Sequence, residues 1–229
     1  MNDVAIEAPR RMKVVLDEKY GFPFLDVETD PIDLELTTIF LKAELDRLTD
    51  EEESLIKRSQ KAQGNLKLLV EKHIRIGISD PTARKKIENM FGNMCFDTLQ
   101  FLATYGREYE PADMGPKGFL LDQGNCFGNS FVVARDTDLC YVEGVCRPPF
   151  GEPMLHGWNA WPDQTGNEVR DTTYPRADLN RYFGISVPLF HLEVLAKLAN
   201  ARVPGGIFRK ERWSPVTKRY LLKHVVGKY

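Results

Sequence analysis

The chain has 229 residues, of which 42% are hydrophobic and 28% are charged, and its formal net charge is −2. This length and composition allow one sizeable core or two small ones and argue against a largely disordered chain. A net charge so close to zero argues against a protein that coats nucleic acid along its whole surface. No apolar stretch approaches the roughly 20 residues that span a bilayer, so we expect no membrane-spanning helix.

Charge is divided unevenly between the two ends of the chain. Residues 1–58 carry fifteen Asp/Glu against eight Lys/Arg, whereas residues 202–229 carry eight Lys/Arg and a single acidic residue, Glu211. The basic end predicts a contact with a macromolecular partner, and nucleic acid is one alternative. A solvated helix face, or a contact with the acidic N-terminal part, explains the same pattern more simply.

The cysteines and the N-terminal sequence indicate a reducing environment. The first residues lack the basic flank and apolar run of a secretory signal, so we expect a cytoplasmic protein with reduced thiols. Cys95, Cys126, Cys140 and Cys146 have neither the spacing of a disulfide framework nor the paired Cys-x-x-Cys motifs of structural zinc sites. We therefore expect no metal and no cofactor, although a metal site made of three cysteines and His156 stays open as an alternative.

The N-terminal half is predicted to be helical after an irregular, proline-containing start over residues 1–31. Apolar residues follow a broadly helical pattern over residues 32–48. A second helix should begin at the capping box Thr49-Asp50-Glu51-Glu52 and end near Gly77. A third should begin after Asp80-Pro81 and continue to Gly106, with its stripe of Met, Phe and Leu facing a core.

The pattern changes after a connector over residues 107–118. Strands are predicted at 139–145, 154–161 and 168–173, with a turn at 163–167 before the last of them, and helices are predicted at 190–201 and from Ser214-Pro215 onward. The chain is therefore predicted to be an α+β protein whose helical N-terminal half packs against a small antiparallel sheet.

Three residues between Gln123 and Thr173 have the chemistry of a catalytic site. Cys126 follows a turn of small residues and begins a predicted helix, whose unpaired N–H groups and partial positive charge favour a thiolate. His156 and Asp171 lie on two strands joined by one turn, which would make them neighbours across the strands. This pattern is typical of a nucleophile, a base and a group that fixes the imidazole.

Other residues nearby are candidates for substrate binding. The amide groups at the predicted helix start could hold the oxyanion of an attacked carbonyl, and Gln123 is the best side-chain candidate for a second donor, with Asn125 beside it. Trp158 is most simply a core or cleft-wall residue, with stacking on a substrate as the alternative. Cys126 could instead be an inert core thiol, and Asp171 a cap for local backbone.

Four short motifs, in this order, resemble the transglutaminase-like branch of the papain-like cysteine enzymes. That family has a cysteine at a helix start, then Tyr-Val-x-Gly on a strand, then His-Ala-Trp, then Asp-x-Thr. This chain has Cys126, Tyr141-Val142-Glu143-Gly144, His156-Gly157-Trp158 and Asp171-Thr172-Thr173. Gly157 replaces the usual alanine, and the interval from Cys126 to Tyr141 is shorter than is common. The match covers about 50 of the 229 residues, and the chain also resembles small bacterial and phage proteins with the same pattern.

The resemblance implies Cys126 as nucleophile, His156 as base and Asp171 as the group that holds the imidazole. It implies acyl transfer, with hydrolysis of a peptide or amide bond as the preferred reaction. It also suggests a helical region at 1–110, a transglutaminase-like catalytic core at 111–201 and a basic segment at 202–229, together one compact unit. The alternative is a catalytically inactive scaffold that binds protein or nucleic acid.

Overall fold

The computed structural model describes residues 49–62, 65–92, 94–111, 121, 124–149, 151–161, 168–174, 177–201 and 205–226. Its helices are α3 (Asp50–Ala62), α4 (Leu66–Ser79), α5 (Arg84–Met90), α6 (Phe96–Tyr105), α7 (Cys126–Asp136), α8 (Leu189–Leu198) and α9 (Pro215–His224), with short 3-10 turns η1 (Pro81–Ala83) and η2 (Ala177–Leu179). Its strands are β1 (Arg107–Pro111), β2 (Cys140–Arg147), β3 (Met154–Ala160), β4 (Glu168–Arg170) and β5 (Arg181–Val187). The helix predicted over residues 32–48 and the turn predicted at 163–167 lie outside the described residues.

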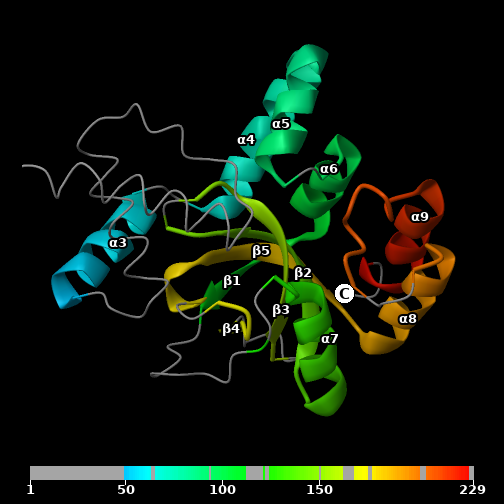
Figure 1. Ribbon diagram of the computed structural model, residues 1–229. Coiled ribbons are helices and arrows are strands. Elements are labelled where there is room, and N and C mark those ends of the chain that lie inside the picture. Colours follow the sequence, from blue (N-terminus) through cyan, green and yellow to red (C-terminus); the bar gives the residue numbers. More distant parts are fainter. Residues whose placement is uncertain are drawn as a thin grey trace, which may run out of the picture.

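The five strands form a closed barrel in the order β1-β4-β3-β2-β5, around which the helices are arranged (Figure 1). The pairs β2–β3, β2–β5, β3–β4 and β1–β5 are antiparallel, whereas β1 and β4 run parallel. The mixed α+β composition agrees with the prediction. The prediction of a small antiparallel sheet was wrong, because the strands form a closed, mixed barrel. The sheet closes on itself because β1 and β5, which the sequence did not indicate, join its two sides.

The barrel has its own core. Side chains from all five strands fill the interior, namely Tyr109, Val142, Cys146, Trp158, Ala160, Val169 and Tyr182. Where β2 pairs with β5, Gly144 lies opposite Gly184, and a Cβ atom on Gly144 would collide with the carbonyl oxygen of Phe183 and with Cα of Gly184. The glycine of the Tyr-Val-x-Gly motif is therefore required by the close approach of two strands.

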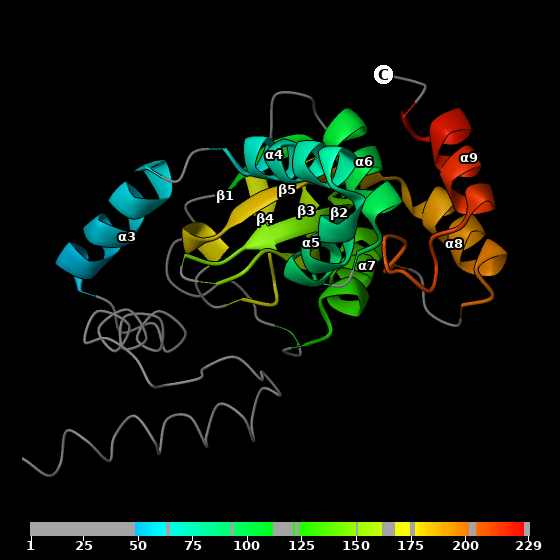
Figure 2. The same ribbon diagram turned by 90° about the horizontal axis from the view of Figure 1, so that it is seen from above.

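A second core lies between the outside of the barrel and the helices. It includes Leu99 and Leu102 of α6, Val145 of β2, Phe183 of β5 and Leu221 of α9. In both views α4, α5 and α6 cover one side of the barrel and α8 and α9 lie together at another (Figures 1 and 2). Helix α7 packs directly on β3 and β2, which brings its first residue to the strand that carries His156.

The second predicted helix is two helices, α3 and α4. The capping box is confirmed, because the Thr49 amide donates to Glu52 at 2.9 Å and the Glu52 amide donates to the Thr49 hydroxyl at 3.3 Å. A new helix begins after Asn65, whose side chain accepts a hydrogen bond from the Leu68 amide and so caps α4. A cap inside the predicted helix marks a new start that the apolar pattern alone does not reveal.

The third predicted helix is also interrupted. It starts at Asp80-Pro81 as predicted, but α5 ends before Gly92, which has a φ of +67°, and α6 begins only at Phe96. A left-handed backbone at Gly92 ends the helix because only glycine takes this conformation without strain. Gly106 ends α6, as expected.

The remaining elements follow the prediction more closely. The three predicted strands are β2, β3 and a shorter β4, and the two predicted C-terminal helices are α8 and α9. Ser214 caps α9 by accepting from the Thr217 amide at 3.1 Å. The predicted boundary between residues 110 and 111 falls inside β1. None of the described helices is long and apolar enough to cross a membrane.

Candidate active site

Cys126 is the first residue of α7 and is half-buried. Gly124, two residues earlier, has a φ of +83°, and nothing lies within 4 Å of its Cβ position. Glycine is therefore favoured here because of the left-handed backbone conformation, since a side chain would meet no steric clash. Asn125 precedes the helix but makes no side-chain capping bond, and its amide lies against Gly128. The first amide groups of α7 therefore have no cap from Asn125 and can bind an anion or an oxyanion.

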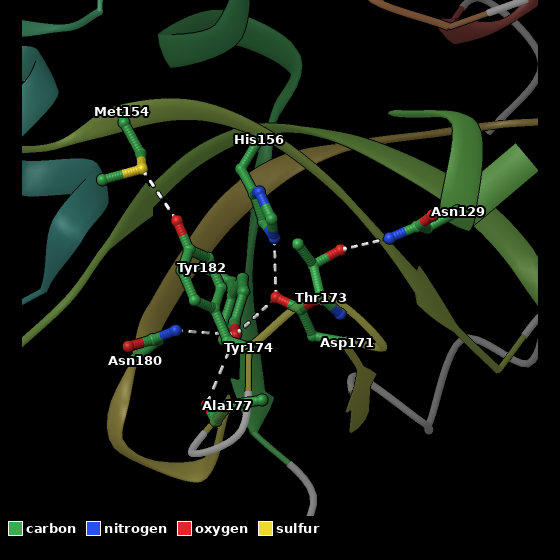
Figure 3. Close-up of polar contacts among 9 residues, drawn as sticks. All are labelled: Asn129, Met154, His156, Asp171, Thr173, Tyr174, Ala177, Asn180 and Tyr182. Atoms are coloured by element: carbon green, nitrogen blue, oxygen red, sulfur yellow. Dashed lines mark hydrogen bonds and ion pairs between the residues drawn. The ribbon is translucent and has the colours of Figure 1, made fainter. Parts of the chain in front are cut away.

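His156 and Asp171 form a buried pair inside the barrel (Figure 3). The Nε2 atom of His156 lies 2.6 Å from Oδ2 of Asp171, and the two residues are 1% and 0% exposed. The pairing of Asn159 with Arg170 places Asp171 diagonally across from His156 on the same face of the sheet. The structure thus brings together the two residues that the strand pattern suggested.

Three groups donate hydrogen bonds to the Asp171 carboxylate. His156 and the hydroxyl of Tyr182 both reach Oδ2, the latter at 2.9 Å, and the Thr173 amide reaches Oδ1 at 2.9 Å. The Asn180 side chain donates to the Tyr182 hydroxyl at 3.2 Å, which directs the single hydroxyl proton toward an acceptor such as Asp171 (Figure 3). Three donors hold this carboxylate in a fixed orientation.

The imidazole ring is enclosed by aromatic side chains. Its centroid lies 4.9 Å from Tyr174, 6.2 Å from Trp158 in a nearly parallel orientation, and 6.3 Å from Tyr182. Trp158 is 0% exposed and packs against Tyr109 in the barrel interior. Trp158 therefore supports the histidine from within and offers no face to a substrate, so the alternative of stacking on a substrate is wrong for this residue.

The protonation of His156 is set by its two neighbours. Burial disfavours the charged ring, but the Asp171 carboxylate and then Cys126, by a hydrogen bond and by charge, outweigh it and raise the pKa of His156 to about 10. Because Nε2 faces Asp171, Nδ1 is the ring nitrogen left for Cys126. At neutral pH the imidazole therefore carries its proton, with Nδ1 directed toward Cys126.

A link between α7 and the segment after β4 keeps these parts in register. The side chain of Asn129, one turn along α7 from Cys126, donates to the Thr173 hydroxyl at 3.3 Å (Figure 3). The Thr173 amide in turn binds Asp171. The helix that carries the nucleophile and the residue that orients the base are therefore connected through one buried threonine.

The other cysteines lie in different surroundings. Cys146 is fully buried in the barrel, and burial raises the pKa of its thiol well above the ordinary value. Cys95 lies beside the Thr98 hydroxyl at the start of α6, and Cys140 is half-buried on β2. Among the described residues, which include all four cysteines and His156, no group of three or more suits a metal ion.

The sequence missed Tyr182, Asn180 and Tyr174. Tyr182 lies on the unpredicted strand β5, and Asn180 lies just before it. The aromatic and β-branched residues Tyr182, Phe183, Ile185 and Val187 were the available signal for that strand. Gln123, the proposed second oxyanion donor, lies outside the described residues, so its role stays a prediction.

Comparison of the chain with models of protein families, with curated proteins and with solved structures gives no match. The case for the chemistry of this site therefore rests on its own geometry.

Proposed function

We propose that the protein is a cytoplasmic, cysteine-dependent acyl-transfer enzyme of the transglutaminase-like kind, and that it hydrolyses a peptide or amide bond. The observation that carries this proposal is the buried His156–Asp171 pair, whose second ring nitrogen is available to Cys126 at the start of α7. A structural histidine needs neither a buried carboxylate with two further donors nor a thiol at a helix start.

The reaction follows from these positions. The Cys126 thiolate attacks the carbonyl carbon of the amide, and the carbonyl oxygen becomes an oxyanion that the first amide groups of α7 stabilise. The intermediate collapses as His156 gives its Nδ1 proton to the leaving nitrogen, so the C–N bond breaks and a thioester and an amine result. Asp171 remains ionised and holds the ring in place.

The second half of the reaction returns the enzyme to its starting form. A water molecule gives a proton to His156 as its oxygen attacks the thioester carbonyl. The C–S bond then breaks, which releases a carboxylic acid and restores the thiolate beside the imidazolium. We choose water as the acceptor because it requires no second binding site for an amine.

The alternative is an inactive scaffold that binds protein or nucleic acid through its basic end. Part of that end is used for packing within the chain, since Trp213 and Lys218 both contact Asp97 at the start of α6. This internal use of basic and aromatic groups favours the enzyme over the binding module.

Alkylation by iodoacetamide at pH 7, mapped by mass spectrometry, tests the proposal. Cys126 should react at least about 10-fold faster than Cys95 and Cys140, the two other half-buried thiols, and His156→Gln should remove most of this advantage. Cys140→Ala is the matched control and should leave Cys126 labelling unchanged. Equal labelling of Cys126 in the wild type and in folded His156→Gln would refute the thiolate–imidazolium pair.

Turnover separates the enzyme from the inactive scaffold. A library of fluorogenic peptide and amide substrates should yield at least one that the wild type cleaves and that Cys126→Ala does not. A reactive Cys126 with no cleavage, together with tight binding of protein or nucleic acid by both forms, would favour the scaffold.

A further inference from the structure

We propose that Arg209 binds a carboxylate of the substrate, so that the enzyme acts on amides that carry a carboxylate near the bond to be cleaved. This inference rests on the proposed function of Cys126 and names the class of substrate. It concerns a residue from the segment between α8 and α9, far from Cys126 in the sequence but in contact with Phe127, the residue that follows Cys126.

The position of Arg209 is defined by an aromatic ring beside the nucleophile. The guanidinium carbon lies 4.7 Å from the ring centroid of Phe127, the residue that follows Cys126 in α7. The other neighbour of this ring is Gly157, next to His156, since a Cβ atom there would lie 3.1 Å from Cδ1 of Phe127.

The guanidinium is available to a ligand. Arg209 is exposed, and within the part of the chain that the structure describes its side chain has no ion pair or hydrogen bond; its stem lies beside Gly206 and its guanidinium over the ring of Phe127. Its neighbour Arg212, in contrast, donates to the carbonyl oxygen of Gly205. A guanidinium stacked on a ring keeps its N–H edge free, and that edge matches the two oxygens of a carboxylate.

The segment that carries Arg209 is held firmly. Glu143 of β2 is 0% exposed and accepts a hydrogen bond from the Phe208 amide at 2.8 Å, while the Gly206 amide donates to the Tyr141 hydroxyl at 3.3 Å. The Tyr141 hydroxyl donates to the same carboxyl group. A buried carboxyl group is costly unless it is satisfied in this way, so the interaction fixes the segment against β2.

Two glycines allow this segment to turn toward α7. Gly205 and Gly206 have φ values of +92° and +66°, and a Cβ atom on Gly205 would lie 2.7 Å from the Tyr141 hydroxyl and 3.2 Å from Cβ of Phe127. In both views the segment runs along the side of the barrel where α7 packs (Figures 1 and 2). The backbone is thus shaped to bring Arg209 over Phe127 from a distant part of the chain.

The other described basic side chains near the C-terminus serve differently. Lys218 pairs with Asp97, Lys210 is exposed next to Arg209 in the sequence but is not among the cations placed over an aromatic ring, and Arg219 and Lys223 lie exposed along α9. Arg219 therefore offers a matched control, since it has the same charge and exposure at a site away from α7.

The test is a set of alkylating reagents that react with Cys126 and differ only in charge. Iodoacetyl derivatives of glycine, β-alanine and γ-aminobutyric acid place a carboxylate at three distances from the reacting carbon, and each has a neutral carboxamide twin. In every case the Cys126 sulfur bonds to the CH2 carbon and iodide leaves. The readout is the ratio of the acid rate to the amide rate for Cys126, measured in 0.15 M salt, where exposed charges beyond about 8 Å are screened.

At one spacer length the wild-type ratio should exceed that of Arg209→Met by about 5- to 10-fold, with Arg209→Lys in between because it keeps the charge but not the planar fork. Arg219→Met should keep the wild-type ratio. An equal ratio in wild type and Arg209→Met at all three lengths would overturn the inference. Failure of the proposed function gives a different result, in which the neutral reagents alkylate Cys126 no faster in the wild type than in His156→Gln.

Discussion

The hydroxyl group of Tyr182 donates a hydrogen bond to Oδ2 of Asp171 at 2.9 Å. Both residues are fully buried, and this oxygen is the one that also faces the imidazole of His156. Tyr182 thus adds a fourth residue to the proposed Cys–His–Asp arrangement and keeps the carboxylate oriented inside the barrel.

Tyr182→Phe should lower the free energy of unfolding by about 1.5 to 3 kcal/mol, because it removes a hydrogen bond to a buried charge. It also leaves the Asn180 amide without its acceptor. Urea unfolding at pH 7 measures the loss.

Tyr174→Phe is the matched control. The Tyr174 hydroxyl also makes a hydrogen bond near His156, but to the sulfur of Met154 at 3.0 Å, and a thioether is a weak acceptor. This variant should lose about 1 kcal/mol or less. Equal losses in the two variants would show that Tyr182 contributes nothing special to Asp171.

Stability should fall as pH rises above neutrality, and His156 should be a main cause. The ordinary pKa of 6.5 is raised to about 10 in the folded chain, so His156 stays protonated there between these values. Because the proposed ion pair takes this proton from Cys126, the folded state binds one more proton than the unfolded state only above the ordinary thiol pKa of about 8.5. This stabilisation is therefore lost mainly as pH rises from about 8.5 through about 10, with a slope of up to about 1.4 kcal/mol per pH unit.

Urea unfolding of the wild type and of His156→Gln at several pH values between 6.5 and 10 measures this slope, which should be shallower in the variant. His73→Gln is the control, since His73 lies on α4 with its ring bonded to the Leu69 carbonyl. A slope that is the same in all three proteins would contradict the elevated pKa.

The contact between His156 and Asp171 could be predicted because it depends on short stretches of sequence. His156 and Asp171 are joined by a single turn, so the alternation of two adjacent strands is enough to bring them to one face. Cys126 stands at a helix start that Gly124 and Asn125 mark, and helix starts are among the strongest local signals. The contact between Cys126 and His156 depends on the packing of α7 on β3. Only the resemblance to a family suggested that packing.

Closure of the barrel could not be predicted in the same way. Arg107 of β1 pairs with Gly184 of β5, so the contact joins segments that are far apart in the sequence. The strand β1 is short and carries charges at Glu108 and Glu110, which resemble a polar connector. Nearly every residue of β5 is buried, so it lacks the polar alternation that identifies a half-exposed strand.

The break within the third predicted helix has a similar explanation. The stripe of Met, Phe and Leu continues through α5 and α6 because both helices face the same core. The periodicity of apolar residues indicates which side chains are buried. It does not indicate where the chain changes direction. Gly92 was the local signal, since its positive φ ends α5.

Gly157→Ala should slow alkylation of Cys126 by about 3- to 10-fold, because small displacements of a nucleophile have large effects on rate. A Cβ atom at this position would lie 3.1 Å from Cδ1 of Phe127 and 3.4 Å from the Cys126 carbonyl oxygen. The added methyl group must push the first turn of α7 a few tenths of an ångström away from β3. The alanine of the family pattern thus implies a slightly wider spacing than this chain has.

Gly151→Ala is the control for that variant. Its Cβ atom would also lie 3.1 Å from its nearest neighbour, but that neighbour is Cγ of Pro148, next to Gly151 in the segment between β2 and β3. Iodoacetamide kinetics and thermal unfolding of both variants compare the two crowding effects. Wild-type labelling in folded Gly157→Ala would show that the spacing of α7 and β3 does not limit the reaction.

Glu143→Leu should destabilise the fold by about 3 kcal/mol or more, because it leaves the Phe208 amide and the Tyr141 hydroxyl buried without their acceptor. Glu143→Gln keeps one carbonyl oxygen and should lose less. Hydrogen exchange at the amides of residues 206–208 should speed up in the same order, whereas Glu193→Gln, an exposed change on α8, should alter neither measurement. If these amides exchange at the wild-type rate in Glu143→Leu, the buried carboxyl group does not hold the segment. Arg209 must then owe its position to Phe127 alone, and Phe127→Leu should release it.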